Sequence, residues 1–391
     1  MKTGNRCTIC TGCGRCFGEV KEDTKILSFE HPVGEKKTVS SSVILVDIGT
    51  TTIAMVLIAG NGEVLDSYAV LNPQGMYGVD VISRIAASED PEKLASMRSL
   101  VLDEISKGIK KFSNAADPAS CKICISANTT MTYLLRGLSP EELGKAPFKA
   151  THISEDTVSI PACGKEYEAS ILPGFSAFVG SDIYAGVLAS KLCTSDKYKL
   201  LCDLGTNGEI ALGNKDHLYV TATAAGPAFE GGPCKGIWGA DMISLTSRLL
   251  KDGYMDSTGL LKDPYFDEGI DIGNVHITQD SVRALQLAKG AIYAGINIIC
   301  ERASISFEDI DEVILAGGFG YFLNPADASS IGLIPDGLSS KCTPGGNTAL
   351  KGALCFAEGE RVLQDPAVIN LAEEPSFNDL YMNALNFPEF L

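Results

Sequence analysis

The chain has 391 residues, 45% of them hydrophobic and 21% charged, a composition typical of a soluble globular protein of two or three domains. Its net charge of −17 argues against binding to a nucleic-acid backbone, which requires a basic surface. The start of the chain lacks the apolar core of a secretory signal, and no apolar run approaches the roughly 18 residues of a membrane span. We therefore expect a cytoplasmic protein with no membrane segment.

Four cysteines near the start of the chain form an unbroken C-x2-C-x2-C-x2-C pattern: Cys7, Cys10, Cys13 and Cys16. Four soft thiolates this close together favour a [4Fe–4S] cluster. Structural zinc is the alternative, although its ligands usually come from two well-separated pairs. The last spacing and Phe17 differ from the bacterial ferredoxin run, in which the fourth cysteine follows three residues and precedes proline. A cysteine elsewhere in the chain is therefore left open as the fourth ligand.

The remaining cysteines are scattered, and 13 is an odd total, which argues against a disulfide framework in a cytoplasmic protein. Cys121 and Cys124 form another C-x2-C pair, but they fall on a predicted buried strand. We expect both to be small apolar core residues.

A polar segment over residues 19–42 is interpreted as a hairpin or linker, and an α/β pattern follows it. Three strands joined by tight glycine-containing turns come first, then two helices, a strand and a further helix. The predicted strands cover 43–49, 51–59, 64–71 and 121–128, and the predicted helices cover 79–88, 94–112 and 129–138.

The same order begins again at residue 199. Three strands over 199–226 are followed by an irregular insert at about 226–278 and a helix over 281–300, for which Asp280 is the expected N-cap. A strand then ends in glycines near residue 320, and another helix opens at 324. We predict two homologous α/β halves: a cluster segment and linker at 1–40, a first lobe at 41–193 and a second lobe at 194–391.

An Asp-x-Gly-Thr turn closes the first strand of each half, as VDIGTTT at 46–52 and CDLGTNG at 202–208. Glycine lets the backbone approach an anion, and exposed N–H groups and hydroxyls can hold phosphate oxygens. An aspartate at the strand end offers the hard oxygen that Mg²⁺ prefers. We predict that Asp47 and Asp203 face each other across a nucleotide cleft, the alternative being two ordinary hairpins.

A third glycine-rich segment lies between a buried strand and a helix, in ILAGGFGYFLNP. Gly317, Gly318 and Gly320 would allow an adenosine ring to lie against the backbone there. The sequence has neither a Walker A loop nor a G-x-G-x-x-G motif.

These three motifs resemble those of the superfamily of ATPases built like actin, hexokinase and the heat-shock chaperones (ASKHA), which have two ribonuclease-H-like lobes. Further segments are similar to the reductive activators of corrinoid-dependent enzymes. They are YGVDVISRI (77–85), NTTMTYLLRG (128–137), AAGPAFEGG (224–232), QLAKGAIYAGI (286–296) and GNTALKGA (346–353). This resemblance implies that ATP hydrolysis drives an electron uphill, resetting an oxidised Co(II) corrinoid to Co(I). Such activators commonly carry a plant-type [2Fe–2S] domain, whose cysteine spacing is missing here.

The resemblance also implies roles for individual residues. Asp47 and Asp203 would handle Mg²⁺ and the attacking water, and Glu230 and Glu209 are further candidates for the same task. The phosphate contacts would be Gly49, Thr50, Thr51, Thr52, Gly205, Thr206 and Asn207. The residues bordering the nucleoside would be Gly226, Gly317, Gly318 and Gly320. Lys289 lies in mid-helix where a nucleotide could reach, with an ordinary surface lysine as the alternative.

We predict an ATPase coupled to electron transfer, with a [4Fe–4S] cluster, ATP and Mg²⁺ as cofactors. The acceptor would be a corrinoid protein or another low-potential metalloprotein, and the donor a reduced ferredoxin or similar protein, while a homodimer is left open. A small-molecule kinase of the same superfamily is the alternative enzyme, but a kinase needs no redox centre. A nucleotide-gated scaffold or cluster carrier is the non-enzymatic alternative.

Overall fold

The computed structural model describes residues 41–389, apart from residue 206 and residues 227–238, 273–274 and 321–322. This part of the chain divides into two compact units. The N-terminal unit comprises residues 41–191 and 346–363, and the C-terminal unit comprises residues 192–345 and 364–389. The predicted cluster segment at 1–40 lies outside the described residues.

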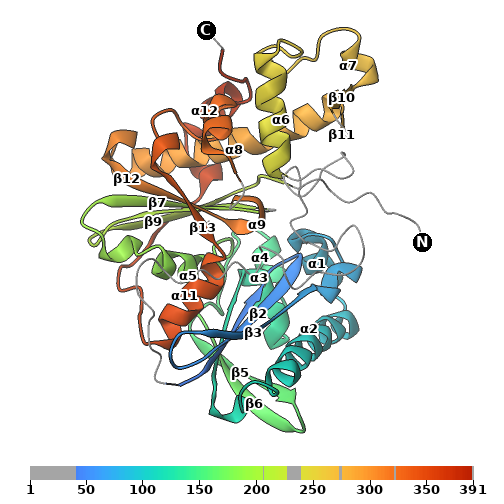
Figure 1. The fold of residues 1–391 in the computed structure, drawn as a ribbon, viewed down its shortest axis with the longest axis vertical. Helices are drawn as coiled ribbons and strands as arrows, with labels where there is room; N and C mark the ends of the chain where they lie inside the picture. The colour runs from blue at the N-terminus through green and yellow to red at the C-terminus, as the bar shows by residue number, and fades with distance from the viewer. Residues whose placement is uncertain (1–40, 206, 227–238, 273–274, 321–322, 390–391) are drawn as a thin grey trace. The chain divides into compact units, whose positions relative to one another are not determined.

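A six-stranded sheet in the order β3-β2-β1-β4-β6-β5 forms the centre of the N-terminal unit (Figure 1). The first three strands are antiparallel, β4 is parallel to β1, and β6 is parallel to β4. The strands are β1 Val43–Ile48, β2 Thr52–Ile58, β3 Val64–Leu71, β4 Lys122–Ala127, β5 Asp156–Ala162 and β6 Lys165–Ile171. The β5–β6 hairpin adds an edge that the sequence analysis does not predict.

Helices cover both faces of this sheet because β1 is apolar on both sides. Ile44 and Val46 pack in a core with α2 and α3, whereas Val43 and Leu45 pack in a second core with α5 and α11. The helices of this unit are α1 Val81–Ala87, α2 Pro91–Phe112, α3 Thr129–Arg136, α4 Glu141–Gly144, α5 Ser181–Ala189 and α11 Thr348–Ala357. Successive side chains of a strand point to opposite faces, so the same rule places every later residue of β1.

The C-terminal unit repeats the arrangement around a sheet in the order β13-β12-β7-β8-β9-β14. Strands β7, β8 and β9 form an antiparallel meander, and β12 runs parallel to β7 as β4 does to β1. The strands are β7 Tyr198–Leu204, β8 Gly208–Gly213, β9 Leu218–Thr223, β12 Ile310–Ala316, β13 Cys342–Gly346 and β14 Ala367–Ile369, with a small hairpin of β10 Ile270–Ile272 and β11 Val275–Ile277. The predicted fold class of two α/β halves is confirmed, while the predicted bounds of the halves stay a prediction.

The helices of the C-terminal unit include the longest one of the described chain, α8. They are α6 Gly239–Lys251, α7 Tyr265–Glu268, α8 Gln279–Ala303, α9 Gly317–Gly320, α10 Pro325–Ser330 and α12 Phe377–Ala384. The predicted N-cap of α8 is wrong by two residues, because Thr278 is the cap and Asp280 lies in the first turn. The Thr278 hydroxyl accepts a hydrogen bond from the Ser281 N–H, and the Ser281 hydroxyl accepts one from the Thr278 N–H.

The described cysteines follow the core expectation only in part. Cys124 lies in β4 and is buried, whereas Cys121 precedes the strand and is partly exposed. Cys202, Cys300 and Cys355 are also buried. Among the described residues, no helix is both long and apolar enough to cross a membrane.

Close helix packing joins α5 to α11 in the N-terminal unit. A Cβ atom added at Gly352 of α11 would lie 1.8 Å from the carbonyl oxygen of Ala185 in α5. The two backbones can therefore approach only because residue 352 has no side chain.

We predict that Gly352→Ala lowers the free energy of unfolding by about 1–3 kcal/mol, because the added methyl group forces the helices apart. Gly290→Ala is the matched control, since residue 290 is also a helical glycine but its nearest neighbours are side-chain atoms at 3.3 Å or more. Urea unfolding of both variants tests the prediction, and equal stabilities would contradict it.

Candidate functional site

Asp47 is the penultimate residue of β1, and the strand period puts its side chain on the face that α5 and α11 cover. Asn347, the N-cap of α11, donates a hydrogen bond from Nδ2 to Oδ2 of Asp47 at 2.9 Å. Asp182, in the first turn of α5, is close enough to Asp47 to interact with it electrostatically. The starts of two helices therefore meet the end of the strand.

The sequence analysis missed Asp182 and assigned no role to Asn347. A signal for Asn347 was available, because it begins the GNTALKGA segment on which the family resemblance partly rests. Asp182 follows Gly180 at the start of α5, where a carboxylate in the first helical turn is favourable with or without a ligand. The proximity of Asp182 to Asp47 arises from the packing of α5 on the sheet, and the local sequence does not indicate it.

The two carboxyl groups are harder to ionise than ordinary aspartates. Burial is the main cause that raises the pKa of Asp47 to about 7. The hydrogen bond from Asn347 lowers this pKa, and the negative charge of Asp182 raises it. Burial likewise raises the pKa of Asp182 to about 6. Two carboxylates sharing a partly desolvated site favour a bound cation, which would relieve their repulsion.

Hydrogen bonds within the turn after β1 and from two asparagine side chains hold the turn in place. The Gly49 N–H donates to the Thr52 carbonyl at 2.9 Å, and the Asn72 side chain donates to the Gly49 carbonyl at 2.8 Å. The Asn128 side chain, at the start of α3, donates to the Thr50 hydroxyl at 3.0 Å. Thr50 is only 8% exposed, so its hydroxyl lies at the rim of the core. The predicted phosphate loop is thus a turn whose backbone and Thr50 hydroxyl are held by hydrogen bonds.

Asp203 occupies the equivalent position in the C-terminal unit, as the penultimate residue of β7. The Gly205 N–H donates to the Asn207 carbonyl at 3.0 Å in the following turn. Glu209 of β8 stands directly opposite Asp203 in the antiparallel register, so both side chains lie on one face of the sheet. Glu209 is only 8% exposed, so it is not a solvated surface carboxylate.

Gly317, the first glycine after β12, lies against the same aspartate. Residue 317 has a φ of 84°, and a Cβ atom there would lie 2.5 Å from Oδ1 of Asp203. The parallel register explains the contact, because Ala316 of β12 is paired with Asp203 of β7. Gly226 also has a positive φ, of 72°, and among the described residues nothing lies within 4 Å of the position of a Cβ atom there. The structure thus brings the second aspartate and the glycine-rich segment together within one unit.

Lys289 is neither a surface lysine nor a residue poised to meet a nucleotide. It is fully buried in α8, and its Nζ atom donates to the carbonyls of Ala384 and Asn386 at 2.5 and 2.7 Å. Nζ also lies 4.8 Å from the centre of the Phe387 ring. Burial lowers the pKa of Lys289 to about 7. This lysine anchors the segment after α12 to the long helix.

Several predicted site residues are not described by the structure. They are Cys7, Cys10, Cys13, Cys16, Thr206 and Glu230. Asp47 and Asp203 lie in different units, so their facing arrangement stays a prediction.

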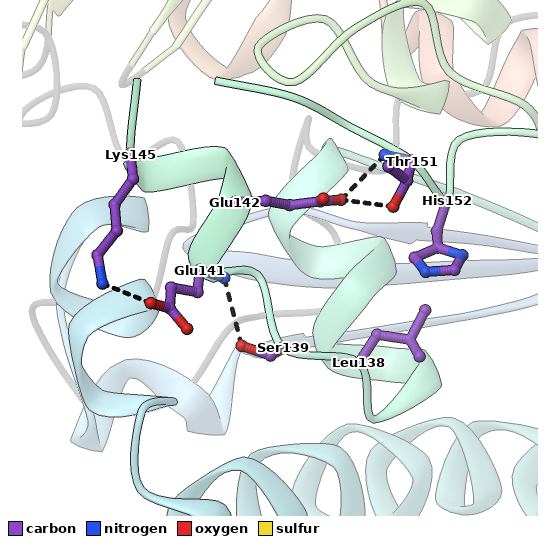
Figure 2. A pocket seen from close by; sticks show the side chains of 7 residues that line it. All are labelled: Leu138, Ser139, Glu141, Glu142, Lys145, Thr151 and His152. Atoms are coloured by element: carbon purple, nitrogen blue, oxygen red, sulfur yellow. Dashed lines mark hydrogen bonds and ion pairs between the residues drawn. The ribbon is translucent and has the colours of Figure 1, made fainter. Parts of the chain in front are cut away.

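A separate open pocket of about 430 Å³ lies in the N-terminal unit beyond the C-terminal end of α3 (Figure 2). Glu142 points to Thr151 there and accepts hydrogen bonds from its N–H and hydroxyl at 2.9 and 2.7 Å. Glu141 pairs with Lys145 on the other side. The N-terminal end of α3, where Asn128 meets the phosphate loop, is a different place.

Among the described residues, no group of three or more histidines, cysteines or acidic residues is arranged to hold a metal ion. The pair of Asp47 and Asp182 nevertheless suits Mg²⁺, which keeps several waters and takes one or two carboxylates together with phosphate oxygens. Burial of the two carboxyl groups raises their pKa values, and a bound cation would favour their ionised form.

Two sheets share an antiparallel three-stranded meander with a parallel strand beside its first strand, and each has an aspartate near the end of that first strand. This arrangement is the α/β fold of the ASKHA class, built from two ribonuclease-H-like lobes. The family model for the RACo middle region matches residues 43–195. The model for the C-terminal domain of RACo, the ASKHA domain, matches residues 197–235 and 232–390. The chain belongs to the RACo family.

The chain is similar to three proteins whose names refer to corrinoid activation or reduction. The chain is 29% identical to the corrinoid activation enzyme RamQ of Eubacterium limosum, over 86% of this chain and 68% of that protein. It is 24% identical to a Co(II) methylated amine-specific corrinoid protein reductase of Methanosarcina barkeri, over 60% of this chain and 56% of that protein. A solved reductive activator for corrinoid, iron-sulfur protein superposes with a TM-score of 0.78 at 29% identity, over 91% of this chain and 67% of that one. The chain therefore spans between about half and two thirds of the length of these relatives.

We predict that Asp182→Asn reduces the loss of stability that the wild type shows as the pH rises. A carboxyl group whose pKa is raised by folding stabilises the fold below that pKa, and this contribution is lost as the pH rises through about 4 to 7. Asparagine cannot ionise, so the variant should lose less stability than the wild type between about pH 4.5 and pH 7.

Urea unfolding without Mg²⁺ or nucleotide measures the difference. Asp90→Asn is the control, because Asp90 is an exposed N-cap whose pKa is lowered, chiefly by the Glu92 N–H, and it is already ionised over this range. An identical pH dependence in wild type and Asp182→Asn would refute the prediction.

Proposed function

We propose that this protein is an ATP-dependent reductive activator that returns an oxidised Co(II) corrinoid, bound to a partner protein, to Co(I). The observation that carries the proposal is the match to RACo family models along residues 43–390. The names of the relatives, a corrinoid activation enzyme, a corrinoid protein reductase and a reductive activator, point to the same reaction. We further propose that it acts in the cytoplasm.

ATP would bind with its phosphates on the turns after β1 and β7. In the N-terminal unit, Asp47 and Asp182 would hold hydrated Mg²⁺, and Asn347 would fix the orientation of the Asp47 carboxylate. Bound Mg²⁺ would neutralise charge on the phosphates. In the C-terminal unit, Asp203 or Glu209 would orient the attacking water, and the backbone at Gly317 would border the nucleoside. The chain would then contribute by positioning and electrostatics, as is usual for phosphoryl transfer.

The electron would pass through a [4Fe–4S] cluster on Cys7, Cys10, Cys13 and Cys16, which the sequence pattern alone supports. A reduced ferredoxin or similar donor loses one electron, and the Co(II) centre gains it. ATP binding would favour the complex with the oxidised partner if the closed state binds that partner more tightly. A low-potential metalloprotein without a corrinoid is the alternative acceptor.

A direct test mixes the protein anaerobically with a Co(II) corrinoid protein, a reductant and ATP, and follows the optical spectrum of Co(I). The proposal expects Co(I) to form only when ATP and the activator are both present. ATP-dependent transfer of phosphate to a small molecule, with no Co(I), would favour the kinase alternative instead.

We predict that Asp47→Asn and Asp203→Asn each lower the rate of ATP hydrolysis by about 100-fold or more, comparable to the loss of one preorganised electrostatic contact. Formation of Co(I) should fall in parallel, because hydrolysis drives it. Asp311→Asn is the control: Asp311 is an exposed carboxylate paired with Lys197, and its loss should leave turnover unchanged. Turnover near the wild-type rate in Asp203→Asn would defeat the two-sided phosphate site.

We predict about four irons per chain after anaerobic purification, with the absorption of a cubane cluster. Cys10→Ser or Cys13→Ser should abolish the cluster and leave ATP binding intact, whereas Cys163→Ser, which changes an exposed cysteine, should leave the iron content unchanged. Purified protein that contains zinc in place of iron would contradict the proposed [4Fe–4S] cluster. A complete cluster in Cys16→Ser would identify a remote fourth ligand.

A further inference from the structure

A buried polar network lies directly beneath the turn after β1. It consists of Asn72, Gln74 and Arg84, whose side chains are 5%, 0% and 1% exposed. Arg84 belongs to α1, while the other two residues lie between β3 and α1. Burying a guanidinium group is costly unless its hydrogen bonds are satisfied, so the contacts of this arginine need an explanation.

Two members of the network hold backbone carbonyl groups of the turn. Arg84 donates from Nη2 to the Thr50 carbonyl at 2.6 Å and from Nε to the Gly78 carbonyl at 2.9 Å. Asn72 donates from Nδ2 to the Gly49 carbonyl at 2.8 Å. The carbonyls of two successive residues of the predicted phosphate loop are thus drawn inward by side chains.

Gln74 ties this clamp to the core of the unit. Its Oε1 atom accepts from Nη1 of Arg84 at 3.4 Å, and its Nε2 atom donates to the Met97 carbonyl in α2 at 3.0 Å. The clamp is therefore connected to α2 by a hydrogen bond.

The planar peptide bond relates the direction of these carbonyl groups to the direction of the N–H groups in the loop. In a planar trans peptide the C=O of one residue and the N–H of the next point in opposite directions. Holding the carbonyls of Gly49 and Thr50 inward therefore turns the N–H groups of Thr50 and Thr51 to the other side of the loop. Successive N–H groups aimed one way form an anion-binding concavity, and a buried positive charge behind them strengthens the attraction for phosphate.

We propose that Arg84 is a positioning residue of the ATP site, which fixes the phosphate-binding orientation of the loop without touching the nucleotide. This inference rests on the proposed function, in that it takes the turn after β1 as a phosphate loop. Asn72 acts in the same way through the Gly49 carbonyl. The competing explanation is that Arg84 only fastens α1 to the rest of the unit.

The two explanations differ in which part of the nucleotide they affect. A positioning role weakens binding of ATP and leaves adenosine alone unaffected, because the glycines expected to border the nucleoside lie in the C-terminal unit. If Arg84 has only a structural role, its loss lowers thermal stability and does not weaken ATP binding more than adenosine binding.

The experiment measures dissociation constants for ATP by displacement of a fluorescent nucleotide, and for adenosine by ligand-observed NMR. Arg84→Met removes both donors to the backbone and should weaken ATP binding about 10-fold or more. Arg84→Lys keeps the charge but loses the forked geometry, and should give an intermediate loss. Asn72→Ser keeps a hydroxyl acceptor for the Gln74 N–H but cannot reach the Gly49 carbonyl, and should weaken ATP binding in the same direction.

Ile105→Ala is the matched control, because it removes a fully buried side chain of α2 that makes no polar contact with the loop. It should lower the melting temperature and leave ATP affinity within about twofold. If Arg84→Met fails to fold, Arg84→Lys and Asn72→Ser carry the test.

Unchanged ATP affinity in the folded variants, or equal losses for ATP and adenosine, would overturn the positioning role while the proposed function stands. A wild-type protein that does not bind ATP would overturn both. Selective loss of ATP affinity in Arg84→Met and Asn72→Ser, with Ile105→Ala unaffected, is the expected result.

Discussion

The alternation of side chains along β1 determines where the site of the N-terminal unit lies. Ile44, Val46 and Ile48 fill one face of the sheet, so Asp47 must point to the other, where α5 and α11 begin. A shift of one residue in this strand would place the carboxylate in the apolar core with α2 and α3. The hydrogen bond from Asn347 and the proximity of Asp182 both follow from this single placement.

Glycine sets the limits of approach in both units. Gly352 allows α11 to lie against the backbone of α5, which places the starts of both helices at Asp47. Gly317 allows the end of β12 to lie against Asp203. In each case a side chain would occupy the space of a backbone or carboxylate atom, so the glycine is a geometric requirement of the site.

Equivalent turns follow the first strand of each unit. The turn after β1 is held by side chains from three other segments, through Asn72, Arg84 and Asn128. The described contacts of the turn after β7 include the hydrogen bond between Gly205 and Asn207 and the close approach of Gly317. In both units the aspartate is the penultimate residue of the first strand, beside a hydrogen-bonded turn.

Local patterns in the sequence were enough to predict eight of the strands, the two halves and the aspartate at the end of each first strand, because apolar alternation and glycine turns depend on neighbouring residues. The strands β5, β6, β10, β11, β13 and β14 were not predicted. The chain of contacts around those aspartates was not predictable in the same way. Asn347 lies 300 positions from Asp47, and Asp182 carries no local mark of its role. Lys289 has the sequence context of an exposed helical lysine, yet it is buried because the end of α12 and the segment after it pack on α8 and supply two carbonyl acceptors. The sequence by itself determined which elements form and where the aspartates stand along them, since those depend on short-range sterics and period. Tertiary structure alone decided which distant side chains meet each aspartate, because packing joins residues whose separation along the chain leaves no local signal.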